Sequence, residues 1–346
     1  MKAVLFCKLP YAYSILAPIE KELLKRNITC LWYIPKDILP HFNPRHSPCT
    51  DCIQELDAFG ADMNFVPGNH IPWFLRGVKV QVFHGMAGEK KGHFRIRDYF
   101  DLYLTQGPYF THRFQHLAAK HGNFRVRETG WSKLDSLYCT PPDAQRQRAQ
   151  LLENAQAKYL VLFAPTFSPS LTCADALFDD IVALSKHPDY LVMTKFHDKL
   201  RPDLVARYAA AESTSLRLIA DSDITAWLHT ADLMVSDTSS VVYEYLLLDK
   251  PIVTVNSQSD NVRWRNITTP GELVPAVTEA LHDNAKQRAC RQRVIADYHP
   301  YRDGQSARRM VDATVDFIQT HGVPAARHIP VMRKLKLIKK YRVLRW

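Results

Sequence analysis

Residues 221–256 read DSDITAWLHTADLMVSDTSSVVYEYLLLDKPIVTVN, and the middle of this stretch decides the fold class. Leu233 to Val235 forms a short apolar run that predicts a buried strand. Small polar residues, Ser236 to Ser240, then lead into Val241 to Leu248, which is apolar almost all round and predicts a buried helix. Ile252 to Val255 is the next strand. The order strand, turn, helix, strand is typical of a parallel α/β sheet.

The polar turn before this helix is the first candidate site. A turn rich in Ser and Thr at a helix start offers backbone N–H groups and a positive dipole end, which suit a phosphate. Asp237 and the hydroxyls and amides of Thr238, Ser239 and Ser240 are therefore candidate ligands of an anionic donor. Glu244 lies one turn into the helix and either meets a hydroxyl of the donor or pairs with an arginine. An ordinary helix cap has the same pattern, and spacing alone does not separate the two interpretations.

The start of the chain predicts a doubly wound sheet. Lys2 to Cys7 reads as a strand, Ser14 to Lys25 as a helix and Ile28 to Ile34 as a second strand. No GxGxxG follows the first strand, so we expect no nicotinamide or flavin cofactor and predict none of any other kind. Apolar runs predict further strands at residues 63–66, 79–83, 100–105, 124–128, 159–163, 190–194 and 216–219. Residues 35–50 and 257–269 read as loops, and helices are expected at 175–185, 270–282, 285–296 and from 306 to about 320.

His84 is the first candidate catalytic residue. The strand Lys79 to Phe83 ends at His84 and Gly85, and ligands bind at the carboxyl ends of parallel strands. An imidazole there can act as a general base, and Gly85 lets a substrate approach the backbone closely. The alternative is a loop histidine that is hydrogen-bonded to the backbone.

Two strand ends in the second half of the chain carry further polar residues. Thr166 follows the strand at residues 159–163, where its hydroxyl can contact a donor phosphate. Lys195 and His197 follow the strand at residues 190–194, and they can neutralise a diphosphate or stabilise its leaving group.

The segment SDTSSVVYEYLLLDKPIV, residues 236–253, resembles the CDP-glycerol glycerophosphotransferase family, the teichoic-acid polymerase-like enzymes, in its S-D-x-S-S residues and in the aspartate before the final Pro-Ile. His84-Gly85 is similar to the family's H-G-x-x-x-K, with Lys90 or Lys91 at a looser spacing, and Lys195-Phe-His197 is similar to its K-x-H-P, with Asp198 in place of proline. Residues 129–137 are similar to G-x-P-R-x-D-x-L, and residues 303–306 to D-G-x-A/S. Both segments also read as a turn or a helix start.

The resemblance implies two Rossmann-like domains of parallel sheets facing each other across a cleft, the GT-B type, with C-terminal helices crossing back to the first domain. We expect an acceptor-side domain at residues 1–140, a linker at 141–158, a nucleotide-donor domain at 159–300, a crossing helix at 301–322 and a basic tail at 323–346.

The implied reaction moves glycerol phosphate, or a similar polyol phosphate, from a CDP-activated donor to a hydroxyl of a glycan or lipid-linked acceptor in cell-surface polymer synthesis, and it releases CMP. In it His84 takes the acceptor proton, and His197, Lys195 and residues 238–240 hold the diphosphate. The alternatives are a GT-B glycosyltransferase that uses a nucleotide sugar and a binding protein that has kept the fold.

Charge is concentrated at the end of the chain. The formal net charge is +10, and eight cations follow Asp316 with no acid among them. These cations are Arg327, Arg333, Lys334, Lys336, Lys339, Lys340, Arg342 and Arg345. Their apolar neighbours do not align on one helical face, yet a basic apolar segment favours the inner surface of the cell membrane over a solvated end or nucleic acid. We find no apolar run long enough to span a membrane and no signal peptide, so we expect a cytoplasmic protein at that surface.

Two patterns point weakly to metals. The seven cysteines are scattered, which is typical of free thiols in a reducing compartment, and Cys49 and Cys52 form a lone CxxC near His41 and His46. One such pair without a second is a weak signal for zinc or redox chemistry. Asp221 and Asp223 form a D-x-D pattern, but they precede a predicted helix at residues 224–229 and read better as caps, so no metal site is predicted.

Overall fold

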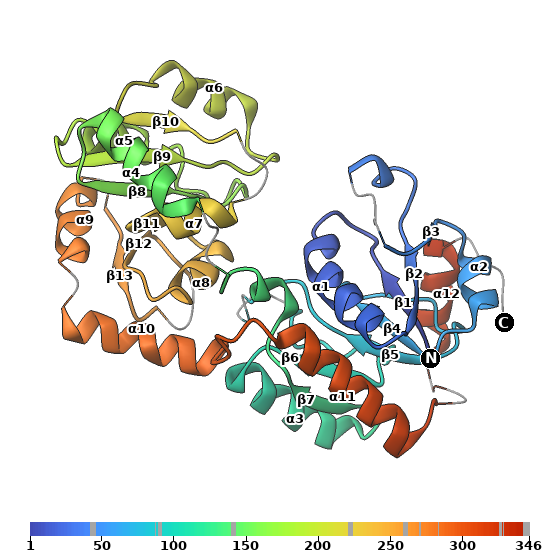
Figure 1. The fold of residues 1–346 in the computed structure, drawn as a ribbon. Coiled ribbons are helices and arrows are strands. Elements are labelled where there is room, and N and C mark those ends of the chain that lie inside the picture. The colour runs from blue at the N-terminus through green and yellow to red at the C-terminus, as the bar shows by residue number, and fades with distance from the viewer. Residues whose placement is uncertain are drawn as a thin grey trace. The chain divides into compact units, whose positions relative to one another are not determined.

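A computed structural model describes residues 1–41, 46–86, 88, 92–139, 143–220, 224–258, 262–269, 271–282, 284–324, 327 and 329–341. The chain forms two compact units. Unit 1 consists of Met1–Tyr138 with Asp297–Trp346, and unit 2 of Cys139–Ala296. Each unit is built on a parallel sheet flanked by helices (Figure 1).

In the described part of unit 1 the sheet has seven strands in the order β3-β2-β1-β4-β5-β6-β7, and every pairing is parallel. The chain leaves β1 on one side for β2 and β3, and on the other side for β4 to β7. The topological switch point therefore lies between β1 and β4, where the loops after both strands diverge and a ligand can enter. The strands are β1 (Lys2–Phe6), β2 (Thr29–Tyr33), β3 (Cys49–Thr50), β4 (Met63–Val66), β5 (Val78–Gln81), β6 (Leu102–Thr105) and β7 (Arg125–Glu128).

In the described part of unit 2 the sheet has six parallel strands in the order β10-β9-β8-β11-β12-β13. Its switch point lies between β8 and β11 by the same reasoning. The strands are β8 (Tyr159–Phe163), β9 (Tyr190–Thr194), β10 (Leu216–Leu218), β11 (Leu233–Ser236), β12 (Ile252–Val255) and β13 (Arg265–Ile267).

Helices connect the strands and cover the sheets. Unit 1 contains α1 (Ala12–Lys25), α2 (Ile53–Phe59), α3 (Pro108–His121), α11 (Ser306–His321) and α12 (Val331–Tyr341), with short 3-10 helices at Leu39–His41 and Ser132–Asp135. Unit 2 contains α4 (Ala144–Ala155), α5 (Phe178–Ser185), α6 (Pro202–Ala210), α7 (Thr225–Thr230), α8 (Val241–Leu246), α9 (Leu273–Leu281) and most of α10 (Ala285–Tyr298). Every residue of the central strands β4, β5, β9, β11 and β12 is buried, as expected of a sheet that is covered on both faces.

The helix α11 returns the chain to unit 1. The guanidinium of Arg26, at the end of α1, forms an ion pair with Asp312 of α11 at 2.7 Å. The Asp135 carboxylate accepts hydrogen bonds from the backbone N–H groups of Ser306 and Ala307, each at 2.8 Å, and so caps the start of α11. The family-like segments at residues 129–137 and 303–306 thus meet in a structural joint of unit 1.

The predicted class of two parallel α/β units with a returning C-terminal helix is confirmed. Four strands, at Met63–Val66, Tyr159–Phe163, Tyr190–Thr194 and Ile252–Val255, have the predicted bounds. The short edge strands β3 and β13 were wrongly read as loops. Each has two or three residues and few apolar side chains, and its pairing with a neighbouring strand decides its conformation.

The basic tail is more ordered than the sequence suggests, because residues 331–341 form α12. Leu337 is 1% exposed, the Tyr341 hydroxyl donates to the His70 carbonyl at 3.1 Å, and Arg333 forms an ion pair with Asp98. One side of α12 is therefore docked on unit 1, and a solvated end is the wrong interpretation for this segment. Arg342, Arg345 and Trp346 lie outside the described residues.

Candidate functional site

The switch point of unit 2 is held together by Asp237, which follows β11. Its carboxylate is 1% exposed and accepts the backbone N–H of Thr166, after β8, at 2.9 Å and that of Cys173 at 3.0 Å. Burial raises the pKa of Asp237, and the hydrogen bonds from Cys173 and Thr166 oppose that shift. Asp237 thus fixes the loop that carries Thr166, and this loop lies beside the polar turn that the sequence singles out.

The rest of the polar turn lies at the surface of the same edge. Thr238, Ser239 and Ser240 are half-buried, and the Thr238 hydroxyl accepts the backbone N–H of Gln258 at 3.0 Å. The helix that follows is shorter than predicted, since α8 ends at Leu246, and Glu244 within it is buried at 9% exposure. The turn therefore presents hydroxyls and backbone amides beside a buried carboxylate.

Lys195 and His197 follow β9, the strand next to β8. The Lys195 ammonium donates to the Phe196 carbonyl at 3.0 Å, and the His197 ring packs against Phe167 with ring centroids 4.3 Å apart. His197 Nδ1 lies 3.1 Å from the backbone N–H of Lys199 and can only accept from it. In the neutral ring the proton is therefore on Nε2, which makes His197 a hydrogen-bond donor.

The charge state of His197 favours that neutral form. Burial lowers the pKa of His197, and the nearby ammonium groups of Lys199 and Lys195 add to this effect, while Asp198 opposes it. A neutral donor beside Lys195 suits an oxygen of a phosphate.

His84, in unit 1, has the opposite arrangement. Its Nδ1 lies 2.9 Å from the Pro67 carbonyl, which can only accept. The proton of the neutral ring is therefore on Nδ1, and Nε2 carries the lone pair that a general base requires. The ring is exposed and stacks on Tyr11 with centroids 5.2 Å apart.

The backbone at His84 is held in an unusual turn. Phe83 has a φ of 59°, in the left-handed region, which costs about 1–3 kcal/mol for a bulky residue. Its ring is buried and packs on Phe114 at 5.0 Å and on His93 at 5.4 Å, so the surrounding aromatic side chains hold the turn. A Cβ on Gly85 would meet nothing within 4 Å, so packing within the protein does not require glycine there and the backbone is open to a ligand.

Two buried groups in unit 1 were not predicted. His93 has a buried Nε2 without a hydrogen-bond partner in the part of the chain that the structure describes, and burial lowers its pKa to about 4. Lys79, inside β5, is fully buried and donates to the Leu75 carbonyl at 2.6 Å. The signal for Lys79 was a single charge within the apolar strand VKVQVF, whereas no sequence pattern singled out His93.

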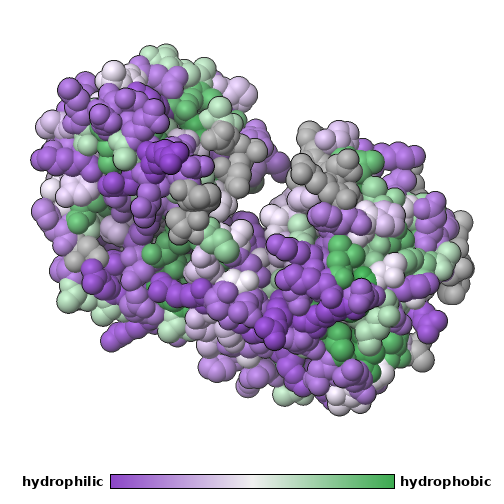
Figure 2. All heavy atoms as spheres, viewed as in Figure 1, coloured by the Kyte–Doolittle hydropathy of each residue, from purple (hydrophilic) through white to green (hydrophobic). Residues whose placement is uncertain are grey.

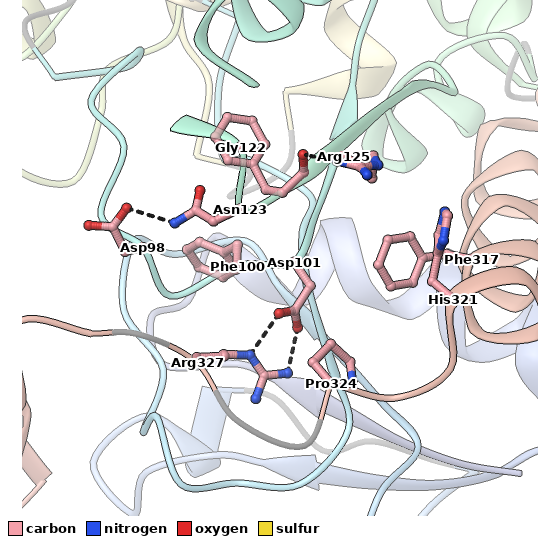
Figure 3. A pocket seen from close by; sticks show the side chains of 11 residues that line it. Asp98, Phe100, Asp101, Gly122, Asn123, Arg125, Phe317, His321, Pro324 and Arg327 are labelled. Carbon is pink, nitrogen blue, oxygen red and sulfur yellow. Dashed lines mark hydrogen bonds and ion pairs between the residues drawn. The ribbon is translucent and has the colours of Figure 1, made fainter. Parts of the chain in front are cut away.

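A cavity of about 310 Å³ lies at the amino ends of β6 and β7, at the sheet edge opposite His84 (Figure 3). Both acids that line it have partners in the protein. Arg327 forms an ion pair with Asp101 at 2.5 Å, and Asn123 donates to Asp98 at 3.2 Å. These contacts anchor the chain after α11 to the sheet, so we read the cavity as part of a structural joint.

The weak metal signals find no support in the described residues. No group of three His, Cys, Asp or Glu residues there could hold a metal ion, and Cys49 and Cys52 are free thiols. Asp221 and Asp223, like Lys90 and Lys91, lie outside the residues that the structure describes.

Two parallel α/β units with polar residues at the carboxyl ends of their strands define a class of proteins that bind nucleotides. Residues 77–263, more than half of the chain, match the family described as CDP-glycerol:poly(glycerophosphate) glycerophosphotransferase. The chain therefore belongs to this family of transferases.

The names of two curated relatives are consistent with this family. The teichoic acid ribitol-phosphate primase of Bacillus spizizenii is 28% identical over 179 residues, which cover 46% of this chain and 45% of the relative. The teichoic acid ribitol-phosphate polymerase TarL of Staphylococcus aureus is 25% identical over 268 residues, or 69% of this chain and 46% of the relative. The chain spans about half the length of these curated relatives.

Solved structures agree on the fold. The wall teichoic acid polymerase TagF superposes with a TM-score of 0.64 at 13% identity, covering 92% of this chain and 89% of the other. The Staphylococcus aureus MnaA–UDP structure gives a TM-score of 0.68 at 14% identity, covering 92% and 97%. At such identities the likeness concerns the fold alone, which is of the GT-B type.

Proposed function

We propose that the protein transfers a polyol phosphate, glycerol phosphate in the first place, from a CDP-activated donor to a hydroxyl of a glycan or lipid-linked acceptor, and releases CMP. The observation that carries the proposal is the grouping of Thr166, Asp237 and the polar turn at one switch point, with Lys195 and His197 on the neighbouring strand end. Family membership over residues 77–263 supports it, because this range contains all of these residues and His84.

Unit 2 binds the donor in this proposal. The backbone amides and hydroxyls of Thr166, Thr238, Ser239 and Ser240 contact the diphosphate, and Asp237 holds the two loops in position. Lys195 and the Nε2–H of His197 stabilise the negative charge that grows on the leaving CMP. Glu244 accepts a hydrogen bond from a polyol or ribose hydroxyl.

His84 of unit 1 acts as the general base. Its Nε2 takes the proton of the acceptor hydroxyl, and the acceptor oxygen forms a bond to the phosphorus that carries the polyol. The bond between that phosphorus and the bridging oxygen breaks, and CMP leaves with this oxygen. General-base help of this kind contributes about 10²–10⁴-fold to the rate.

A donor screen on the full chain tests the proposal. Thermal shifts are measured with CDP-glycerol, CDP-ribitol, UDP-sugars and CMP-sugars, and CMP release is then followed with the best donor and a glycan acceptor. We expect a CDP-polyol to bind best and to release CMP only when the acceptor is present. The strongest shift with a nucleotide sugar would make the protein a glycosyltransferase, and binding without turnover would make it a binding protein.

A matched pair of variants localises the donor. His197→Ala removes the Nε2–H donor and should weaken CDP-polyol binding about tenfold, because hydrogen bonds to charged groups contribute about 1.5–3 kcal/mol. His187→Ala is the control. His187 Nδ1 likewise accepts the backbone N–H two residues on, at 3.2 Å, but it precedes β9, at the other end of this strand. Equal donor binding in both variants would contradict the assignment.

We also propose that α12 attaches unit 1 to the inner surface of the cell membrane. The outward side of this helix exposes Val331 (63%), Met332 (76%) and Leu335 (40%) beside the exposed Lys336 and Lys339. Apolar side chains next to lysines suit an interface of anionic lipid.

Two further observations bear on this attachment. None of the described helices is long and apolar enough to cross a bilayer. On the face seen in Figure 2 hydrophilic residues predominate and hydrophobic ones form small groups. Attachment through α12 would bring the enzyme to a lipid-linked acceptor.

A further inference from the structure

Unit 1 has a second cavity, of about 140 Å³, at its own switch point. The loop after β1 and the loop after β4 line it, and α12 adds a lysine from the far end of the chain. With about 30 Å³ for each water, it has room for roughly four waters, or a phosphate group with its first ester carbons. The lining residues that matter here are Lys8, Tyr11, Gly68, Asn69, His70 and Lys340.

The polar lining of this cavity is positive. Among the residues that the structure describes, neither Lys8 nor Lys340 forms an ion pair with a carboxylate, although the more distant Asp37 acts on Lys8. The Lys8 ammonium lies over the Tyr341 ring at 4.3 Å, which holds it in place. A cavity that gathers cations without a matching acid is a ready site for an anion.

The pKa values agree with this reading. Burial and the neighbouring Lys340 together lower the pKa of Lys8 to about 8, while Asp37 opposes them. Burial also lowers the pKa of His70 to about 4, and the charges that act on its ring most strongly, those of Lys340, Arg97, Lys336 and Lys8, are all positive. An anion in the cavity would remove the repulsion among these groups.

The cavity adjoins the proposed base. Tyr11 lines the cavity and stacks on the His84 ring, and Pro67, whose carbonyl holds His84 Nδ1, directly precedes the lining residue Gly68. A molecule that places a hydroxyl at His84 Nε2 can therefore extend into the cavity. Lys8, His70 and Lys340 all lie outside the matched range 77–263, so the family match does not assign them.

We propose that this cavity binds a phosphate group of the acceptor, gripped by Lys8, Lys340 and the polar groups of His70 and Asn69, while the acceptor hydroxyl lies at His84. The inference rests on the proposed transfer and specifies its acceptor. Each transfer leaves a phosphodiester one polyol away from the new terminal hydroxyl. A product that binds again would thus present a phosphate within a few bonds of the reacting oxygen. The cavity makes a chain end that already carries a polyol phosphate a better acceptor than a neutral glycan.

A binding experiment on the full chain, without any donor, tests the site directly. Three probes are titrated by calorimetry: glycerophosphoglycerol for a phosphodiester chain end, geranyl diphosphate for a lipid diphosphate, and glycerol as the neutral control. We expect Lys8→Ala and Lys340→Ala each to weaken the binding of a phosphorylated probe about 10-fold or more, since a hydrogen bond to a charged group contributes about 1.5–3 kcal/mol. The probe that is affected identifies the source of the phosphate. Lys340→Arg keeps the positive charge, so this variant should bind the phosphorylated probe as the wild type does.

The control variant is Lys339→Ala, which removes an exposed lysine one residue away that does not line the cavity. Unchanged binding of both phosphorylated probes in Lys8→Ala and Lys340→Ala, with all variants folded by circular dichroism, would overturn the inference. So would an equal loss in Lys339→Ala.

Kinetics separate this inference from the proposed function. With a donor that the screen selects, Lys340→Ala should raise the KM for glycerophosphoglycerol about 10-fold and leave the KM for the donor unchanged. No turnover of any CDP-polyol by the wild type would refute the proposed function, whereas turnover with an unchanged acceptor KM would refute the anion site alone.

Discussion

The switch points of the two units share a topology and differ in their chemistry. In unit 2 a buried carboxylate, Asp237, ties two loops together, and the groups presented to a ligand are hydroxyls and backbone amides. In unit 1 no such carboxylate lines the described cavity, and two lysines from opposite ends of the chain meet there. The first arrangement is a pair of loops joined by a buried carboxylate. The second is a positively charged cavity that includes a lysine of the C-terminal helix.

The two candidate site histidines, His84 in unit 1 and His197 in unit 2, also differ in which ring nitrogen carries the proton. His84 Nδ1 faces a carbonyl and His197 Nδ1 faces a backbone N–H, so the neutral rings hold opposite tautomers. His84 thereby offers a lone pair at Nε2, and His197 offers a proton at Nε2. Neighbouring backbone groups thus give the same side chain the role of a base in unit 1 and that of a hydrogen-bond donor in unit 2.

The largest expected effect is the loss of turnover when His84 is replaced, and it distinguishes the base in unit 1 from the hydrogen-bond donor in unit 2. His84→Gln keeps an amide N–H that can reach the Pro67 carbonyl but has no basic nitrogen. Its turnover should fall about 10²–10⁴-fold, while CDP-polyol binding stays unchanged because the proposed donor ligands lie in unit 2. Stopped assays of CMP release and calorimetric titration of the donor measure the two quantities.

The control for this experiment is His112→Gln, an exposed histidine on α3. If His84→Gln turned over at the wild-type rate, or if it lost donor binding in proportion to turnover, the division of labour between the units would be wrong.

Local patterns explain why the sequence predicts the polar strand ends of unit 2. An apolar strand that ends in a polar turn is contained within about ten residues, so residues 163–166, 194–197 and 236–240 could be placed at strand ends without knowledge of the fold. The cavity of unit 1 has no such signature. Lys8, His70 and Lys340 are far apart in the sequence, and only the sheet order and the docking of α12 bring them together.

The sequence also could not predict which side of α12 packs on unit 1. Leu337 and Tyr341 are explained by the surface on which they pack, whereas Val331, Met332 and Leu335 face away from it. A single hydrophobic face is therefore absent from the pattern, although each apolar residue has a consistent environment in the fold.

A smaller effect is expected for membrane attachment, which we propose for unit 1 alone. Met332→Glu combined with Leu335→Glu should reduce sedimentation with phosphatidylserine liposomes about tenfold or more, because full burial of even one such side chain contributes about 1.5–3 kcal/mol. Truncation of the whole tail would be a poorer test, since it also removes Arg327 and Leu337, which hold unit 1 together.

The matched control for attachment is Tyr159→Glu, which changes an exposed aromatic residue of unit 2 (37% exposed). Undiminished sedimentation of the α12 double variant, or an equal loss in both variants, would contradict attachment through unit 1.

The smallest expected effect concerns two buried residues of opposite charge, Lys79 in unit 1 and Asp237 in unit 2. Burial and, to a smaller extent, Arg327 lower the pKa of Lys79 in unit 1 from 10.5 to about 7, while Asp101 opposes them. Above pH 10.5 this lysine is neutral in both the folded and the unfolded chain. As the pH falls towards 7, the unfolded chain takes up a proton that the folded chain does not, so unit 1 loses stability by up to about 1.4 kcal/mol per pH unit.

Lys79→Met should therefore flatten the rise in the unfolding free energy of unit 1 between pH 7.5 and 9.5, and Lys21→Met, on the exposed face of α1, should not. Urea titrations at both pH values measure the unfolding free energy. Equal pH dependence of this free energy in the wild type and in Lys79→Met would show that the ammonium is solvated.

Asp237 in unit 2 affects stability in another pH range. Burial raises its pKa above 3.8, so its contribution to stability is lost as the pH rises through the raised value. Lys79→Met should thus leave the acid range of the pH profile unchanged. This outcome would show that Lys79 and Asp237 titrate independently.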